Sequence, residues 1–301
     1  MNEVTKPELL TGHTDHILTV AYAPDGRHVA SAGKDGAAII HDANTGQRVV
    51  LRGHQKLIYT VRFSPDGKWL ATASDDGTVK LWGVATGREL KTYVKGKLEY
   101  WDSVRSLAFL PDGQTLLLGG NDGTIILWDV ATGQVRSQFK AHTREILSLS
   151  LSPDGKLLAS GGWEDGFKIW DTKTWQQKGA NTDHRGKVWS AVFSPDGQQL
   201  ATGSGDQTIK LWDVATLRLL RTLEGHNDGI FQVAFTPDGK RLASVSDDQT
   251  VKLWNPQTGQ ELLTLREHTN EVWGVAFAPD GRTMLTGSWD KTLRLWRAAP
   301  E

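Results

Sequence analysis

Histidine, hydroxyl and aspartate side chains recur along this chain in an order that could build a hydrolytic triad. In such a triad a histidine, oriented by a carboxylate, takes the proton of a serine or threonine nucleophile. Four sets share one spacing, and each ends in a tryptophan: His54, Thr72, Asp76 and Trp82; His184, Thr202, Asp206 and Trp212; His226, Ser244, Asp248 and Trp254; and His268, Thr286, Asp290 and Trp296. Because an active site needs one such set and this chain carries four, repetition favours a structural role over catalysis.

Metal and cofactor chemistry finds little support in the sequence. The chain has no cysteine, so it offers no thiol nucleophile, disulfide framework or Cys-ligated metal site. The recurring Pro-Asp-Gly turns bring one carboxylate each, whereas a calcium loop alternates several. His16, His28 and His41 do not show a metal-ligand spacing, and a phosphate-binding loop motif is absent. We therefore expect no catalytic residue, no metal and no cofactor.

Charge and hydropathy limit the partners. Among 301 residues, Lys and Arg number 34 and Asp and Glu number 35, which gives a formal net charge of −1. This balance does not indicate binding to nucleic acid or to an anionic membrane. No apolar run approaches the roughly 18 residues of a membrane span, and the first residues do not read as an export signal. The sequence predicts a cytoplasmic protein without membrane attachment.

The elements that position these residues follow a strict repeat. Pro-Asp-Gly occurs seven times at intervals of 41 to 46 residues, with its proline at Pro24, Pro65, Pro111, Pro153, Pro195, Pro237 and Pro279. The histidines of the four sets lie 11 residues before these prolines, and the tryptophans lie 17 residues after them. A period of about 42 residues is typical of stacked or radial repeat arrays rather than of two ordinary domains.

Each unit reads as four short antiparallel strands. In the fifth unit, residues 188–193 precede the turn at 194–197, and the runs 199–203, 208–212 and 218–223 follow. Proline at the second turn position and glycine at the fourth fit a type I turn. The Asp-Gly and Asp-Gln pairs between the later runs fit tight hairpins. Since helical periodicity is absent, the sequence predicts an all-β fold.

Seven such units together resemble the WD40-repeat family. The sixth unit carries the motif as Gly225-His226, then Pro237-Asp238-Gly239, then Ser244 and Asp248, and finally Val251-Lys252-Leu253-Trp254. The resemblance covers essentially the whole chain and implies a seven-bladed β-propeller with four-stranded blades around a central channel. We expect a single domain, residues 1–301, with units at about 11–52, 53–94, 95–140, 141–182, 183–224, 225–266 and 267–301 plus 1–10.

The two ends of the chain predict how the ring closes. After Trp296 only residues 297–301 remain, so no fourth strand can follow in the last unit. Residues 6–11 read like the outer strand of the preceding unit at 260–264. We expect this N-terminal strand to complete the last blade, where Pro7 is tolerated because an outermost strand can lack one N–H donor.

The resemblance also implies roles for the four sets. In WD40 repeats these residue types form a hydrogen-bonded tetrad that fastens the loop before the inner strand to the hairpin and the third strand. Three units depart from this pattern: the first has His41 in place of tryptophan, the third keeps Asp122 and Trp128 but has Tyr100 and Leu118, and the fourth has Glu164 at the aspartate place with Asp165 one residue late. The third unit also has a longer loop at residues 95–101.

Partners of WD40 propellers commonly dock on the face where those loops and hairpins open. Carried over by register, the docking positions include Tyr59, Trp163, Trp189, Phe231, Trp273 and Trp289, together with Asp75, Arg105, Glu145, Lys187, Asp247 and Glu271. Exposed rings interleaved with charges are typical of binding hot spots. The alternative is that some rings pack on one another and plug the channel, whereas register places Trp175 away from this face.

These observations predict a non-catalytic interaction scaffold that docks a protein or peptide. Carboxylates outnumber bases at the docking positions, which favours a ligand with Lys or Arg. The alternative is a propeller that binds or hydrolyses a small molecule in its central channel. We expect the chain to act as a monomer or as part of a larger multidomain protein.

Overall fold

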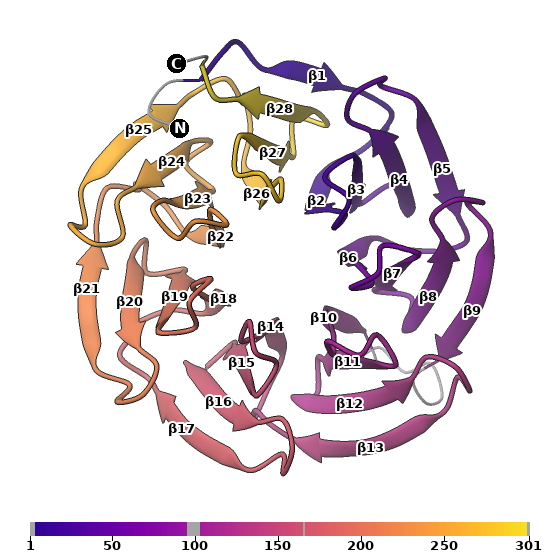
Figure 1. Cartoon of the computed structure of the whole chain (residues 1–301), viewed down its shortest axis with the longest axis horizontal. Coiled ribbons are helices and arrows are strands. Elements are labelled where there is room, and N and C mark those ends of the chain that lie inside the picture. Colours follow the sequence, from indigo (N-terminus) through magenta and orange to yellow (C-terminus); the bar gives the residue numbers. More distant parts are fainter. Residues whose placement is uncertain (1–3, 95–102, 165, 300–301) are drawn as a thin grey trace.

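The computed structural model describes residues 4–94, 103–164 and 166–299. Within these residues the chain forms 28 strands and no helix, so no helix there is long and apolar enough to span a membrane. The strands make seven four-stranded sheets set radially around a central channel (Figure 1). The predicted all-β, seven-bladed propeller is confirmed.

In each of the first six blades, the four strands follow one another in chain order from the channel to the rim. Blades 1 to 3 are β2 (Ile17–Tyr22), β3 (His28–Gly33), β4 (Ala37–Asp42) and β5 (Arg48–Arg52); β6 (Ile58–Phe63), β7 (Trp69–Ser74), β8 (Thr78–Gly83) and β9 (Glu89–Val94); and β10 (Val104–Phe109), β11 (Thr115–Gly120), β12 (Thr124–Asp129) and β13 (Val135–Lys140). Blades 4 to 6 are β14 (Ile146–Leu151), β15 (Leu157–Gly162), β16 (Phe167–Asp171) and β17 (Gln177–Asn181); β18 (Val188–Phe193), β19 (Gln199–Ser204), β20 (Ile209–Asp213) and β21 (Leu219–Leu223); and β22 (Ile230–Phe235), β23 (Leu242–Ser246), β24 (Val251–Trp254) and β25 (Glu261–Leu265). The first strand of each of these blades lines the channel, and the fourth lies at the rim (Figure 1).

The seventh blade takes its outer strand from the other end of the chain. It consists of β26 (Val272–Phe277), β27 (Thr283–Ser288), β28 (Leu293–Arg297) and β1 (Glu8–Leu10). Strand β1 pairs antiparallel with β28, with Leu9 opposite Arg294, and Thr5 N donates to Arg297 O at 3.0 Å. The predicted closure by the N-terminal strand is confirmed, and it leaves the ring without a long open edge.

Two distinct faces follow from the antiparallel pairing. On the loop face, the segment before each inner strand meets the hairpin between the second and third strands, as when Asp75 N donates to Leu57 O at 3.0 Å. On the turn face, the Pro-Asp-Gly turn meets the link to the outer strand, as when Val84 N donates to Lys68 O at 2.9 Å. The inner strands therefore carry side chains from one mouth of the channel to the other.

The Pro-Asp-Gly turn is closed by its own side chains. In blade 2, Asp66 Oδ1 accepts hydrogen bonds from Ser64 Oγ at 2.7 Å and from Lys68 N at 3.1 Å. Gly67 has a φ of 70° and donates its N–H to Ser64 O at 2.9 Å. A Cβ would strain this left-handed conformation, which explains glycine after the aspartate.

Apolar side chains pack between neighbouring blades. Ile209 and Leu211 of blade 5 share a cluster with Ile230, Val233 and Trp254 of blade 6, and each is at most 1% exposed. Six further clusters in the described residues join the other neighbouring pairs. Burying a side chain of this size contributes about 1.5–3 kcal/mol. Because each blade completes its core with the next, the ring rather than the blade is the stable unit.

Candidate interaction face

Each of the four sets is a chain of hydrogen bonds inside its own blade. In blade 6, Trp254 Nε1 donates to Ser244 Oγ at 2.8 Å, and that oxygen lies 2.7 Å from His226 Nε2. His226 Nδ1 lies 2.8 Å from Asp248 Oδ2. All four groups are satisfied when the hydroxyl donates to Nε2 and the Nδ1–H donates to the carboxylate. The same three contacts measure 2.7–3.0 Å in blades 2, 5 and 7.

The hydroxyl groups of these sets cannot meet a substrate. All four hydroxyl residues are 0% exposed: Thr72, Thr202, Ser244 and Thr286. Burial raises the pKa of Asp248, but hydrogen bonds from His226, Thr250 and the backbone N–H of Asn227 outweigh it and hold that pKa below its ordinary value. A nucleophile must contact the atom it attacks. The sets are therefore cross-links that tie each loop to its blade.

Six rings on the loop face touch in series, and we call this series the aromatic arc. In order around the channel its members are His16, Trp289, Trp273, Phe231, Trp189 and Trp163. Trp273 stacks between Phe231 and Trp289, with ring centroids 3.9 and 5.4 Å away. Trp189 meets Phe231 and Trp273 edge to face, at 5.6 and 5.8 Å. Trp273 therefore contacts three other members of the arc.

The ends of the arc come from blades 1 and 4. His16 stacks on Trp289 at 4.4 Å, and Trp163 meets Trp189 edge to face at 6.2 Å. All six rings are half-buried, so each packs on its neighbours and still reaches solvent. The structure brings together five of the six predicted aromatic residues in this arc, and the sixth, Tyr59, lies under the guanidinium of Arg105.

Cations cover the rings on one side of the channel. Lys187 Nζ lies 3.2 Å from the centroid of the Trp163 ring, and Arg144 Cζ lies 5.3 Å from it. Arg105 Cζ lies 4.3 Å from the centroid of the Tyr59 ring. Cation–π contacts of this kind stabilise the two side chains against each other. Tyr59 and Trp163 thus already have cationic partners within the protein.

A like-charged pair lies on the other side, beside the centre of the arc. Glu271 Oε2 accepts a hydrogen bond from Trp273 Nε1 at 2.8 Å. Burial, followed by repulsion from Glu271 and Asp228, raises the pKa of Asp247 to about 6. The fold therefore holds the carboxyl groups of Asp247 and Glu271 close together. A carboxyl group perturbed in this way marks a candidate binding position.

The remaining predicted carboxylates are engaged by the protein itself. Asp75 Oδ2 lies 3.7 Å from Lys56 Nζ. Glu145 is only 7% exposed, and its Oε2 lies 3.4 Å from Arg144 Nε. Counting carboxylates along the sequence therefore overstates the free negative charge, which the structure concentrates at the pair beside the arc.

Comparison with protein families establishes the class of this repeat. The model of the WD40 family, described as WD domain, G-beta repeat, matches residues 5–42, 46–83, 89–129, 133–171, 175–213, 217–255 and 259–297. The chain belongs to the WD40-repeat family. Each WD40 match begins with the outer strand of one blade and continues into the next, so the first match includes β1 of blade 7. WD40 propellers commonly serve as protein-interaction scaffolds and are typically non-catalytic.

Two of the WD40 units that depart from the tetrad lose part of the hydrogen-bond chain. In blade 1, His41 Nε2 lies 3.3 Å from Thr11 O, so the ring bonds the N-terminal segment instead of Ser31. In blade 3, Leu118 fills the hydroxyl place, and Trp128 Nε1 donates no hydrogen bond within the described residues. Tyr100, Asp165 and the loop at 95–101 lie outside the described residues.

The fourth WD40 unit keeps the inner half of the chain. Ser160 Oγ lies 2.7 Å from His142 Nε2 and accepts from Trp170 Nε1 at 2.9 Å. Glu164, at the aspartate place, instead accepts from Arg144 Nη1 at 2.8 Å. One consequence of the replacement is that the hairpin of blade 4 carries an ion pair on the loop face.

Removing the aspartate of a complete tetrad is expected to weaken the WD40 ring. Asp248→Ala leaves the N–H groups of His226 and Asn227 without their acceptor, so the free energy of unfolding should fall by about 1–3 kcal/mol. Asp122→Ala is the matched control, because Asp122 is exposed in a blade without the complete set. Its cost should stay below about 1 kcal/mol. Equal losses in denaturant titrations would contradict the structural role of the tetrad.

Two residues of this face were not selected from the sequence. Arg144 and Asp228 lie nine residues before their Pro-Asp-Gly prolines, in the loop before an inner strand. Register assigned to this face the positions six and eight residues before the proline and the hairpin position, so it included His16 but not these two charges. A charged residue at the ninth position was the available signal.

Proposed function

We propose that this WD40 propeller is a non-catalytic scaffold that docks a peptide or protein segment carrying Lys or Arg on its loop face. The observation that supports this most strongly is the Asp247–Glu271 pair beside the stack of Phe231, Trp273 and Trp289. A cationic side chain placed there would relieve the repulsion between the carboxylates. The same side chain would also be attracted to the electron-rich faces of the rings.

The aromatic arc suits the role of an energetic centre. Buried aromatic side chains at the middle of an interface supply most of the affinity of many complexes. In this chain the rings are held by one another and by the bond from Trp273 to Glu271, so little freedom is lost when a ligand binds. The half-buried rings keep a surface that a partner can cover.

Charge is divided across the face, and this division would orient a ligand. Arg105, Arg144 and Lys187 lie on blades 3 to 5, whereas Asp247 and Glu271 lie on blades 6 and 7. Complementary charges steer association and fix the register of a bound segment. We infer that the basic part of the ligand lies over blades 6 and 7, and that a neutral or acidic part lies over blades 3 to 5.

The remaining expectations about this protein stay predictions. They are the absence of nucleic-acid binding, the cytoplasmic location and the monomeric state, or membership of a larger multidomain chain.

A hydrolytic role would require an accessible hydroxyl beside a histidine, whereas the four sets bury theirs completely. That observation favours the scaffold over a hydrolase.

A peptide array tests the proposal directly. Peptides that bind are expected to contain Lys or Arg, and replacing that residue with Gln should weaken binding by at least tenfold, which is about 1.4 kcal/mol. Glu271→Lys should reduce binding of the same peptides and make it less sensitive to salt. Glu224→Lys, exposed at the outer edge of this face, is the control. Equal binding of neutral or acidic peptides, or no effect of Glu271→Lys, would refute the basic ligand.

The pH dependence of stability provides a prediction that needs no ligand. Because its pKa is raised to about 6, Asp247 is protonated at a higher pH in the folded state than in the unfolded state. Folding is therefore penalised above pH 6, and the penalty disappears as the pH falls toward 4. Asp247→Asn should increase the free energy of unfolding at pH 7.5 by roughly 0.5–1 kcal/mol, since solvent screens the pair. Denaturant titrations at pH 7.5 and pH 4 should show this gain only at pH 7.5; a loss at pH 7.5 would disprove the repulsion.

A further inference from the structure

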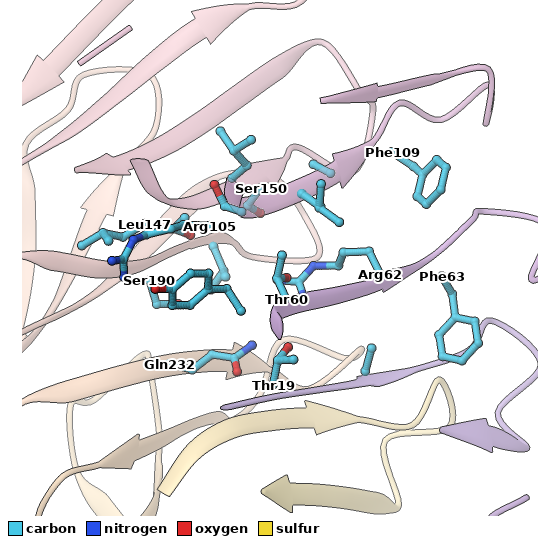
Figure 2. Close-up of a pocket in the computed structure, with 18 of the residues that line it drawn as sticks. Thr19, Thr60, Arg62, Phe63, Arg105, Phe109, Leu147, Ser150, Ser190 and Gln232 are labelled. Carbon is cyan, nitrogen blue, oxygen red and sulfur yellow. The ribbon is translucent and has the colours of Figure 1, made fainter. Parts of the chain in front are cut away.

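The central channel encloses a cavity that is positively charged inside. Its volume is about 470 Å³, within the range of small-molecule sites. Its wall is formed mainly by the inner strands, and Figure 2 shows Arg62, Thr60, Ser190 and Gln232 around it. Two arginines, Arg62 and Arg105, are among the described residues that line the cavity, and no Asp or Glu is. The cavity therefore has two cationic side chains and no carboxylate on its wall.

Arg62 is not required by the repeat. It lies three residues before the Pro-Asp-Gly proline of blade 2, on the inner strand β6. The corresponding residues of the other blades are small or aliphatic: Ala21, Ala108, Ser150, Val192, Ala234 and Ala276. Because six blades form without a charge at this place, the arginine adds something that the fold does not need.

The guanidinium of Arg62 is largely without partners. Its Nη1 donates to Val61 O at 2.8 Å, which is its one hydrogen bond within the described residues, and no carboxylate there pairs with it. An arginine carries five N–H donors in a planar fork. Burial lowers the pKa of Arg62, and no neighbouring charge offsets this effect. Burying a charge without a counter-charge is costly, so a ligand that supplies the counter-charge would be favoured.

A polar side chain on the same strand offers an additional donor. Thr60 lies two residues before Arg62 on β6, and both side chains line the cavity (Figure 2). A hydroxyl donor beside a guanidinium fork matches the oxygens of a phosphate or a carboxylate.

Arg105 lies at the loop-face mouth of the cavity, next to Tyr59. Tyr59 is three residues before Arg62 on the same strand, so the backbone of Arg62 lies about 10 Å further into the channel at about 3.3 Å per residue. An anion that enters from the loop face therefore passes Arg105 before it reaches Arg62.

We propose that the channel binds a small oxyanion, of the phosphate or carboxylate class, on the Arg62 guanidinium, with Arg105 as the second cation at the entrance. The site lies below the aromatic arc and does not depend on the proposed peptide docking. Arg62 neutralises the ligand's charge, and Thr60 supplies a hydroxyl donor. The ligand in turn provides the counter-charge that Arg62 lacks within the protein.

Calorimetric titration of the full chain tests this site. The probes are inorganic phosphate, pyrophosphate and citrate, each at constant ionic strength set with sodium chloride. We expect saturable binding of at least one of them, and Arg62→Gln should weaken that binding by at least tenfold. Arg62→Lys should retain part of the affinity, since it keeps the charge but not the fork. Preference for the phosphates or for citrate identifies the class of the ligand.

Controls separate this site from general charge effects and from the docking face. Arg88→Gln removes an exposed arginine at the rim and should leave anion binding unchanged. Arg62→Gln should leave the affinity for a basic peptide unchanged, so the two proposals fail independently. No saturable binding of any probe, or equal loss in Arg88→Gln and Arg62→Gln, would overturn the proposal.

A melting experiment distinguishes ligand binding from a purely structural arginine. Arg62→Ala places in blade 2 the residue that blade 1 carries at Ala21. In chloride buffer this variant should melt at a temperature equal to or higher than that of the wild type, because it removes an unneutralised charge. The bound oxyanion should raise the melting temperature of the wild type only. A lower melting temperature of Arg62→Ala, with equal shifts for both proteins on adding the anion, would show that Arg62 is structural.

Discussion

Deleting residues 1–11 is expected to abolish the single cooperative unfolding transition of the propeller and to cause aggregation. The deletion removes β1 and with it the pairing to β28 and the bond from Thr5 N to Arg297 O. It also removes Leu10, which is 4% exposed in the cluster that joins blades 7 and 1. Burial of one leucine at about 1.5–3 kcal/mol and several backbone bonds at about 1 kcal/mol each approach the whole stability of a typical domain.

The edge of β28 would then be free to pair with another chain. Size-exclusion chromatography and denaturant unfolding measure the two effects. Two point variants on β1 serve as a matched pair. Leu10→Ala should cost about 2–4 kcal/mol, whereas Leu9→Ala, 52% exposed on the same strand, should cost less than about 0.5 kcal/mol. A truncated protein that remains monomeric with an unchanged unfolding curve would show that the ring closes without β1.

Trp273→Ala is expected to cost at least about 2 kcal/mol of ligand binding, roughly a thirtyfold loss of affinity. Trp273 touches Phe231, Trp289 and Trp189 and donates to Glu271, so it joins the rings to the carboxyl pair. Truncation removes the largest apolar surface at the centre of the arc. It also leaves the neighbouring rings free to move, which adds an entropic cost on binding.

Trp273→Phe separates these contributions. Phenylalanine keeps a ring between Phe231 and Trp289 but cannot donate to Glu271, so an intermediate loss of affinity is expected. Because Trp273 is half-buried among other rings, the free energy of unfolding must be measured for both variants. A drop in affinity that follows the drop in stability across the two variants would contradict a direct contact with the ligand.

Most of the fold could be predicted because its determinants are local and periodic. The Pro-Asp-Gly turn depends on residues within five positions, as the bonds of Asp66 to Ser64 and Lys68 show. Seven copies of that turn at one spacing define the number of blades. The closure also has a sequence signal, since the last unit lacks an outer strand and residues 6–11 resemble one.

The details of the candidate site depend on contacts between blades, which the repeat does not encode. Register placed Phe231 and Trp273 on the same face, but their stacking at 3.9 Å depends on side-chain rotation across two blades. Likewise, the position of Lys187 over Trp163 and the coupling of Asp247 to Glu271 arise between neighbouring units. Such contacts are set by the packing of particular side chains.

Comparative affinity measurement shows whether the loop face around the aromatic arc is the docking surface. A Lys- or Arg-containing peptide selected on wild-type protein is titrated against wild type, Trp273→Ala and Trp175→Ala. The control residue, Trp175, lies in the turn between β16 and β17 on the turn face, and its ring packs on Phe139 of β13. We predict at least a thirtyfold loss for Trp273→Ala and less than a twofold change for Trp175→Ala. Unchanged affinity in Trp273→Ala, or an equal loss in Trp175→Ala, would contradict docking on the loop face.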